Sequence, residues 1–221
     1  MISPALRTSS WATPRIDLGG CVLYLPLWRP SGDMTGSTIY SYDSIRHTCT
    51  VTNGTWGTYG RVLSGTGSLI DLGINALLNT VQTGAYTWIF WAKTAAAGQQ
   101  TLINYPTYKP RITIEGGIVN RFNWYDGTSI NGTNDMEVDD GKWHFYVITL
   151  NNTTVAFYYD LIAEGGGTSG TFSGSAPDVG IIAGSSASFN GTIGEVLIYN
   201  RVLSASEIIR LYQQTKWRYI T

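Results

Sequence analysis

The chain has 221 residues, of which 13% are charged, and its net charge at pH 7 is −1. Its lysines and arginines are scattered, which excludes the basic stripe of a nucleic-acid-binding surface and the polybasic patch that binds a membrane surface. No apolar run approaches the roughly 20 residues that a membrane span requires. The length is ample to bury a core without disulfides or a metal.

Residues 1–15 are expected to form an irregular arm. They lack the charged start and the apolar stretch of a secretion signal. We therefore expect synthesis in the cytoplasm, with the protein reaching a virion surface or the extracellular space after release. The low charge and the abundance of hydroxyl and amide side chains are typical of extracellular and virion β-proteins.

Two cysteines, Cys21 and Cys49, lie in strand-like runs. In a chain without a secretion signal, isolated thiols are expected to be reduced and buried. A disulfide between them is the alternative, if the two strands are neighbours.

Short apolar and aromatic runs alternate with Gly, Asn, Ser and Asp turns through most of the chain. Many short strands at frequent intervals predict a β-sandwich or barrel. The predicted strands are Cys21–Leu27, Cys49–Trp56, Leu69–Leu72, Tyr86–Lys93, Thr101–Tyr105, Arg111–Glu115, Arg121–Tyr125, Trp143–Asn151, Thr154–Tyr159, Asp178–Ala183 and Gly191–Tyr199. The Gly-rich stretch 165–170 is predicted to be a flexible loop.

Two of these strands, Tyr86–Lys93 and Trp143–Asn151, are apolar on both faces. In the second, Phe145 and Val147 alternate with Tyr146. A strand of this kind is covered on both sides. One face is expected to pack into the sandwich, and the other to meet a loop or helix, line a groove or join a partner subunit.

One short helix is predicted after the last strand. Ser204 and Glu207 have the spacing of a capping box, in which the hydroxyl accepts from the amide of Glu207 and the carboxylate reaches back. Ile208, Ile209, Leu211 and Tyr212 follow as an apolar stripe. We expect one domain over residues 16–214 and a short tail over residues 215–221.

Three stretches together resemble the laminin-G-like, concanavalin A-like lectin/glucanase jelly-roll family. They are Val22–Leu27, then Asp140–His144 running into Val155–Asp160, and finally Phe189–Val196 followed by Leu203–Glu207. The resemblance implies an all-β fold of two stacked antiparallel sheets with a short C-terminal helix, and a concave face often used for glycan binding.

Many members of this family also hold a calcium ion, and here the sequence departs from the pattern. Gly194 stands where the family usually has Asp before Glu195, and Leu161 stands where it usually has Gly after Asp160. Calcium takes six to eight oxygen ligands, and no dense acidic loop supplies them. A structural calcium held by backbone carbonyls remains open, as do its ligands.

The best candidates for the catalytic carboxylate pair of a glycoside hydrolase are the alternating residues Asp135, Glu137 and Asp139, with Asp140 beside them. The resemblance puts them in a loop before Trp143, so a solvated acidic loop is the expected reading and no catalytic residue is assigned. Of the two histidines, His144 is expected to be structural, and His47 follows Arg46 in a polar loop.

A glycan site needs flat aromatic faces beside amide and carboxylate groups. The candidate residues are Asn123, Trp124, Tyr125, Asp126 and Asn131 around one hairpin tip, with Tyr105 and Tyr108 in another loop. We expect a non-catalytic module that binds carbohydrate or cell-surface glycan. The alternative is a virion structural protein whose jelly roll contacts other virion proteins or copies of itself, and a glycoside hydrolase is the third hypothesis.

Overall fold

The structure is a computed structural model. It describes residues 16–29, 32–65, 67–73, 78, 84–105, 110–128, 130–132, 136–170, 181–182 and 188–220. The predicted arm, residues 1–15, lies outside the described residues.

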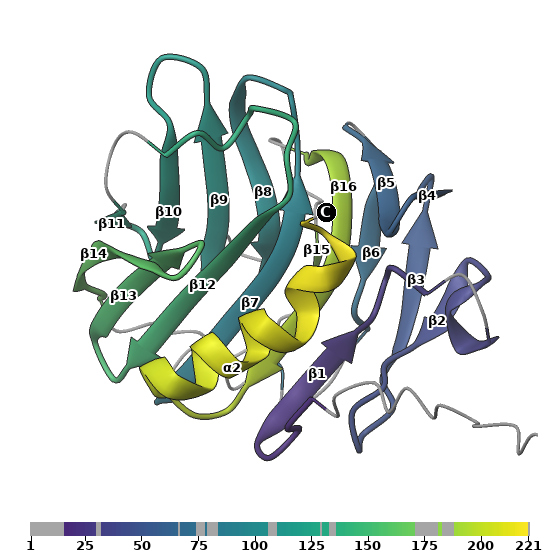
Figure 1. Ribbon diagram of the computed structural model, residues 1–221, viewed down its shortest axis with the longest axis horizontal. Coiled ribbons are helices and arrows are strands. Elements are labelled where there is room, and N and C mark those ends of the chain that lie inside the picture. Colours follow the sequence, from purple (N-terminus) through teal and green to yellow (C-terminus); the bar gives the residue numbers. More distant parts are fainter. Residues whose placement is uncertain are drawn as a thin grey trace, which may run out of the picture.

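Two antiparallel sheets of eight strands each pack face to face in the described part of the chain (Figure 1). The first sheet has the order β14 (Ile162–Thr168), β13 (Thr154–Tyr159), β12 (His144–Asn151), β7 (Ala85–Lys93), β16 (Asn190–Tyr199), β5 (Gly60–Ser64) and β4 (Thr55–Gly57), and β1 (Cys21–Leu25) also pairs with β16. The second sheet has the order β11 (Ile130–Asn131), β10 (Arg121–Tyr125), β9 (Arg111–Gly116), β8 (Gly98–Asn104), β15 (Ile181–Ile182), β6 (Leu69–Asp71), β3 (Thr48–Thr52) and β2 (Thr38–Tyr40). The described part of the chain also contains the 3₁₀ turns η1 (Gly32–Met34) and η3 (Lys216–Arg218) and the helix α2 (Ala205–Thr215). The predicted all-β jelly-roll sandwich with one short C-terminal helix is confirmed.

The main core lies between the two sheets. Trp88, Phe90 and Tyr146 of the first sheet meet Phe122 and Trp124 of the second. The rings of Trp88 and Trp124 are 5.1 Å apart. Burying apolar side chains of this size contributes about 1.5–3 kcal/mol each, so this layer holds the sandwich together.

The opposite face of the first sheet is covered by the C-terminal helix. Ile89, Trp91 and Phe145 form a second apolar cluster with Ile208 and Leu211 of α2, and Figure 1 shows α2 lying across β12 and β7. Among the alternatives for the second apolar face of these strands, the structure therefore selects the helix.

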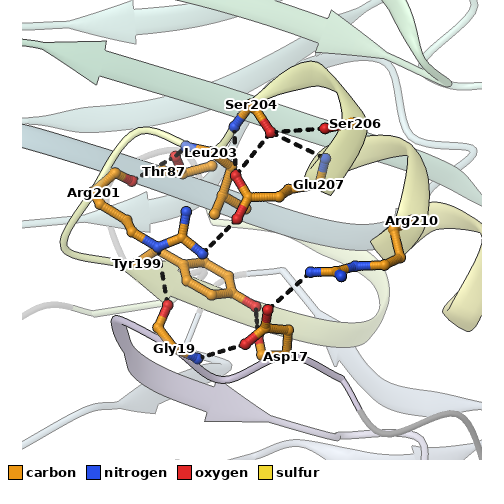
Figure 2. A network of polar contacts seen from close by, with 10 residues as sticks. All are labelled: Asp17, Gly19, Thr87, Tyr199, Arg201, Leu203, Ser204, Ser206, Glu207 and Arg210. Carbon is orange, nitrogen blue, oxygen red and sulfur yellow. Dashed lines mark hydrogen bonds and ion pairs between the residues drawn. The ribbon is translucent and has the colours of Figure 1, made fainter.

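The start of α2 is fixed by the predicted capping box and by an ion-pair network (Figure 2). The Ser204 hydroxyl accepts from the Glu207 N–H at 3.3 Å, and the Ser204 N–H donates to the Glu207 carboxylate at 2.8 Å. Arg201 pairs with Glu207 at 2.8 Å, and the Arg201 and Ser204 hydrogen bonds lower the pKa of Glu207 to about 2. Arg210 pairs with Asp17 at 2.8 Å, which ties the described N-terminal segment to the helix.

Some of the predictions about local structure are wrong. The segment predicted as the flexible loop 165–170 instead contributes residues 165–168 to β14. A Cβ on Gly166 would collide with the Val155 carbonyl oxygen, and one on Gly167 would lie 2.7 Å from Ile130. The glycines therefore permit a close approach of strands that a side chain would prevent.

The predicted strand Cys49–Trp56 is two strands that belong to different sheets. Asn53 has a φ of 50° and lies between β3 of the second sheet and β4 of the first. Asn is one of the few residues that adopt this conformation readily, and it turns the chain from one layer to the other.

The residues beyond α2 are packed rather than forming a tail. Arg218 and Tyr219 are 5% and 6% exposed and lie against the first sheet. The two cysteines are free and buried, as expected, and burial raises the pKa of each thiol to about 12. No helix within the described residues is long and apolar enough to span a membrane.

Candidate functional site

The hairpin of β9 and β10 carries alternating apolar and polar side chains. Ile112, Ile114, Phe122 and Trp124 belong to the core between the sheets. Successive side chains of a strand point to opposite faces, so the residues between them point outward. These outward residues are Arg111, Thr113, Glu115, Arg121, Asn123 and Tyr125.

The strand register sets several of these polar side chains next to one another. Tyr125 pairs with Arg111, and Arg111 pairs with Asn104 of β8. Asn123 pairs with Thr113 in the adjacent row. The guanidinium of Arg111 lies 4.9 Å from the centre of the Tyr125 ring. We call this surface, formed by Asn104, Arg111, Thr113, Asn123 and Tyr125, the polar face.

Two amides of the polar face are buried although they point away from the core. Asn104 is 6% exposed and Asn123 is 5% exposed. Among the described residues, neither Oδ1 atom has a hydrogen-bond partner. A buried acceptor left unsatisfied costs about 1–3 kcal/mol, so each oxygen favours a donor from water or from a ligand. Sugar hydroxyls are donors of this kind.

The structure corrects the predicted roles of Trp124 and Tyr105. Both side chains are fully buried and belong to the core, so neither ring offers a face to a ligand. The Trp124 N–H donates to the Ser169 hydroxyl at 3.1 Å, and the Trp88 N–H donates to the Tyr105 hydroxyl at 3.4 Å. Strand alternation explains the error, because residues adjacent to Trp124 face outward while Trp124 itself faces inward.

The remaining predicted residues are distributed differently. Asn123 and Tyr125 are on the polar face, and Asn131 pairs with Asn123 through the backbone of β11.

The Asp126 carboxylate accepts from the Ser169 hydroxyl at 3.0 Å and from the backbone N–H groups of Thr128 and Gly170. Asp126 therefore anchors the chain after β14 to the end of β10. Tyr108 lies outside the described residues.

Three residues of the polar face were not predicted from the sequence, namely Asn104, Arg111 and Thr113. The alternation of Arg111 and Thr113 with Ile112 was a visible signal that they share one face. Asn104 could not be assigned in the same way, because a bulge between Thr101 and Ile103 shifts the register of β8.

The acidic tract, residues 135–140, was predicted to be a loop, and its described residues 136–140 do form one. Residues 136–142 have no regular secondary structure, and Asp135 lies outside the described residues. The Asp139 carboxylate accepts from the Gly117 N–H at 2.8 Å. Burial opposes ionisation of Asp140, but hydrogen bonds from Lys142 and His144 outweigh it and lower its pKa to about 2. Both aspartates are thus engaged in local contacts rather than facing each other across a cleft.

His47 has a structural environment. It is 4% exposed, and its Nε2 lies 2.6 Å from the carbonyl oxygen of Val22. This contact links the β2–β3 connection to β1.

The family position for calcium does not fit the ion in this chain. The fully buried Glu195 accepts from the Tyr24 hydroxyl at 2.8 Å and from the Trp28 N–H at 3.0 Å, and Arg218 lies 3.3 Å from its other oxygen. A guanidinium therefore supplies the positive charge. Burial raises the pKa of Glu195. The described residues contain no group of three or more His, Cys, Asp or Glu side chains suited to a metal.

The fold is shared with proteins of known structure at low sequence identity. A sialidase of Trypanosoma rangeli in complex with sialic acid superposes with a TM-score of 0.68 and 16% identity, over 93% of this chain and 35% of the sialidase. The binding domain of botulinum neurotoxin DC in complex with rat synaptotagmin II superposes with a TM-score of 0.66 and 13% identity, over 88% of this chain and 51% of the toxin domain. This chain therefore spans between a third and about half of these proteins, and the likeness establishes the fold alone.

A search of curated proteins by sequence returned no match. A family model described as the concanavalin A-like lectin/glucanases superfamily, Laminin_G_3, matches residues 64–209, which is more than half of the chain. The matched segment runs from the end of β5 into α2 and includes all residues of the polar face. With the two-sheet sandwich, this match shows that the chain belongs to the concanavalin A-like lectin/glucanases superfamily.

Proposed function

We propose that this chain is a non-catalytic glycan-binding module whose ligand lies on the polar face. The observation that carries the proposal is the pair of buried, outward-pointing amide oxygens of Asn104 and Asn123, which have no partner among the described residues. Both oxygens are buried in the unliganded chain, so sugar hydroxyls would donate to them once the groups that cover them move aside. Tyr125 supplies an aromatic surface next to the Arg111 guanidinium, and this combination suits a sugar ring.

A glycan array with the wild-type chain and the Tyr125→Ala variant tests this proposal. The variant removes the aromatic surface, and we expect its dissociation constant for a bound glycan to rise at least tenfold, which is about 1.4 kcal/mol. Asn123→Ala is expected to weaken binding in the same direction because it removes an acceptor.

Tyr40→Ala is a matched control for this test. Tyr40 lies on the same side of the second sheet but on β2 at its other edge, and Arg46 lies 5.0 Å from its ring centre. An equal loss of binding in both tyrosine variants would refute the polar face as the site. Absence of glycan signal with the wild-type chain would refute the proposed function itself.

Hydrogen bonds made by two carboxylates of the acidic tract support the non-catalytic part of the proposal. Asp139 holds the Gly117 amide and Asp140 is bonded to Lys142 and His144. Turnover of laminarin or xylan that is abolished by Glu137→Gln would overturn it in favour of a glycoside hydrolase.

Assembly into a virus particle and display at its surface remain predictions, as does oligomerisation. Light scattering on the chain with and without residues 1–15 tests the oligomeric part. A structural calcium held by backbone carbonyls is also still a prediction, and calorimetric titration with calcium tests it.

A further inference from the structure

His144 lies between two carboxylates that come from different parts of the chain. Its Nδ1 is 2.7 Å from Asp160 Oδ2, and its Nε2 is 3.0 Å from Asp140 Oδ1. Asp160 follows β13 in the turn to β14, whereas Asp140 lies in the connection before β12. The imidazole ring is stacked on Tyr159, with centroids 4.8 Å apart. The ring therefore joins two loops through both of its nitrogens.

This arrangement requires a protonated ring. A neutral imidazole has one N–H and one lone pair, whereas a carboxylate can only accept. With two carboxylates as partners, the neutral ring makes one hydrogen bond and sets a lone pair against the other carboxylate. The imidazolium makes both hydrogen bonds. Burial lowers the pKa of His144, but the hydrogen bonds and charges of Asp160 and Asp140 outweigh burial and raise it above its ordinary value.

The surroundings of the ring carry more negative than positive charge. The titratable and charged side chains of the elements around it are Glu137, Asp139, Asp140 and Lys142 of the connection, Tyr146 of β12, Tyr159 and Asp160 after β13, Glu164 of β14, and Tyr219 beyond α2. Lys142 pairs with Asp140 at 2.7 Å and is 73% exposed, so solvent screens its charge. The imidazolium is the buried cation of this group.

Solvent reaches the ring without unfolding. Hollows of about 330 Å³ and 410 Å³ lie beside it, and both are lined by Lys142 and His144. A proton can therefore leave His144 while the sandwich stays intact.

The connection held by His144 also contacts the second sheet. Asp139, next to Asp140, accepts from the N–H of Gly117 in the turn between β9 and β10. Gly141 donates to the Thr94 carbonyl oxygen after β7 at 2.9 Å. Met136 and Val138, just before them, are buried in the main core. A change at His144 is therefore expected to move residues 139–142 and the β9–β10 turn, and to leave residues 136–138 in place.

We propose that His144 is a pH-dependent latch. In its protonated form it holds residues 139–142 against the β13–β14 turn, and its deprotonation as the pH rises releases these residues and the β9–β10 turn that Asp139 holds. The latch does not depend on glycan binding, and its test uses the unliganded chain.

Asp160→Asn is the decisive variant. Asp160 Oδ1 accepts from the Phe145 N–H at 2.8 Å, and an asparagine oxygen can keep this bond. The asparagine NH₂ then donates to Nδ1 of a neutral ring, whose Nε2–H donates to Asp140. Asparagine also tolerates the φ of 47° at this position. The variant is therefore expected to keep the latch closed without a proton on the second nitrogen.

The test combines an NMR titration with amide exchange. The chain has two histidines, so the signal that disappears in His144→Gln identifies His144. In the wild-type chain, the pKa of His144 is expected above its ordinary value, and the protection factors of the Gly117 and Gly141 amides should fall about tenfold when its proton is lost. In Asp160→Asn the pKa should fall and the protection should persist at alkaline pH.

Two results would overturn the latch. One is wild-type protection of these amides that is the same below and above the His144 transition located by the NMR titration. The other is an Asp160→Asn chain that loses protection with the same pH dependence as the wild type. His144→Gln should have low protection at both pH values, and high protection in this variant would also count against the proposal.

Discussion

The ring of Tyr219 lies directly over Gly194, and a Cβ added at residue 194 would come within 2.7 Å of the Tyr219 Cζ and Oη atoms. Gly194 is part of a bulge in β16, where the register shifts between Ile193 and Glu195 opposite β7. The Tyr219 ring is also stacked on Trp91, with centroids 4.6 Å apart. The glycine thus lets the segment after α2 close on the first sheet.

Gly194→Asp, which restores the residue usual in the family, is expected to destabilise this chain. The added side chain displaces Tyr219, and overpacking of this kind costs about 1–3 kcal/mol. Urea unfolding followed by tryptophan fluorescence measures the loss. In a Tyr219→Ala background the same substitution should lower the free energy of unfolding by less. An equal loss in both backgrounds would contradict the clash with Tyr219 as the cause.

Arg218→Ala is expected to cost about 3–5 kcal/mol, because it leaves Glu195 as a buried charge without its partner. It also removes the guanidinium that lies 4.3 Å from the Trp28 ring centre. Arg210→Ala is the control, because its pair with Asp17 is about half exposed and should contribute less than about 1 kcal/mol. Urea unfolding measures the free energy of unfolding of both variants. Equal losses of stability would refute the larger contribution of the buried Arg218–Glu195 pair.

The Arg218→Ala variant should also depend on pH in a defined direction. Burial already raises the pKa of Glu195 above 4.5, and loss of the guanidinium raises it further. The folded state then binds a proton more tightly than the unfolded state, so stability falls as pH rises from 4.5 through the raised pKa. Unfolding at a series of pH values should therefore show that Arg218→Ala loses less stability relative to the wild type in acid than at neutral pH. A loss of stability that grows in acid would contradict the role of Glu195 as the buried charge left without its partner.

Ser204→Ala is expected to destabilise the chain by about 1 kcal/mol, because the helix loses its N-cap acceptor. Ser206→Ala is the matched control. Its hydroxyl contacts the Ser204 hydroxyl at 3.0 Å but does not cap a backbone N–H, so a change within about 0.5 kcal/mol is expected. Thermal unfolding by circular dichroism compares the two variants, and a larger loss in Ser206→Ala would exclude the capping box as the main contribution.

Both thiols are expected to be unreactive in the native chain. Burial raises the pKa of Cys21 and Cys49 to about 12, so neither is appreciably ionised at pH 8. A thiol-reactive chromogenic disulfide should release colour only after denaturant is added, and then with two equivalents per chain. Rapid reaction of either thiol in native buffer would contradict their burial.

Local sequence patterns were sufficient to predict much of the fold. The alternation within Trp143–Asn151 predicted the two opposite faces of β12, and Ser204 with Glu207 predicted the start of α2. These features depend on residues a few positions apart, so they can be read from one sequence. The apolar stripe of the helix was predicted less well, since Ile208 and Leu211 are buried but Ile209 is 47% exposed.

The candidate site was predicted only in part for the same physical reason. The sequence identified the β10 segment. Its aromatic and polar residues were predicted to form one glycan site, although alternate residues of a strand face opposite sides of the sheet. Trp124 became part of the core, and Asn123 and Tyr125 became part of the polar face. Arg111 and Asn104 joined them through strand pairing, which brings together residues that are distant along the chain.

The sequence by itself determined the β-sandwich and the capped start of α2, because hydrophobic period, turn residues and capping are local properties. The tertiary structure decided which residues meet across strands and layers. It put Arg218 against Glu195, Tyr219 over Gly194 and His144 between two aspartates. Such contacts depend on strand order, bulges and the path of the chain between sheets, and no short-range pattern encodes them.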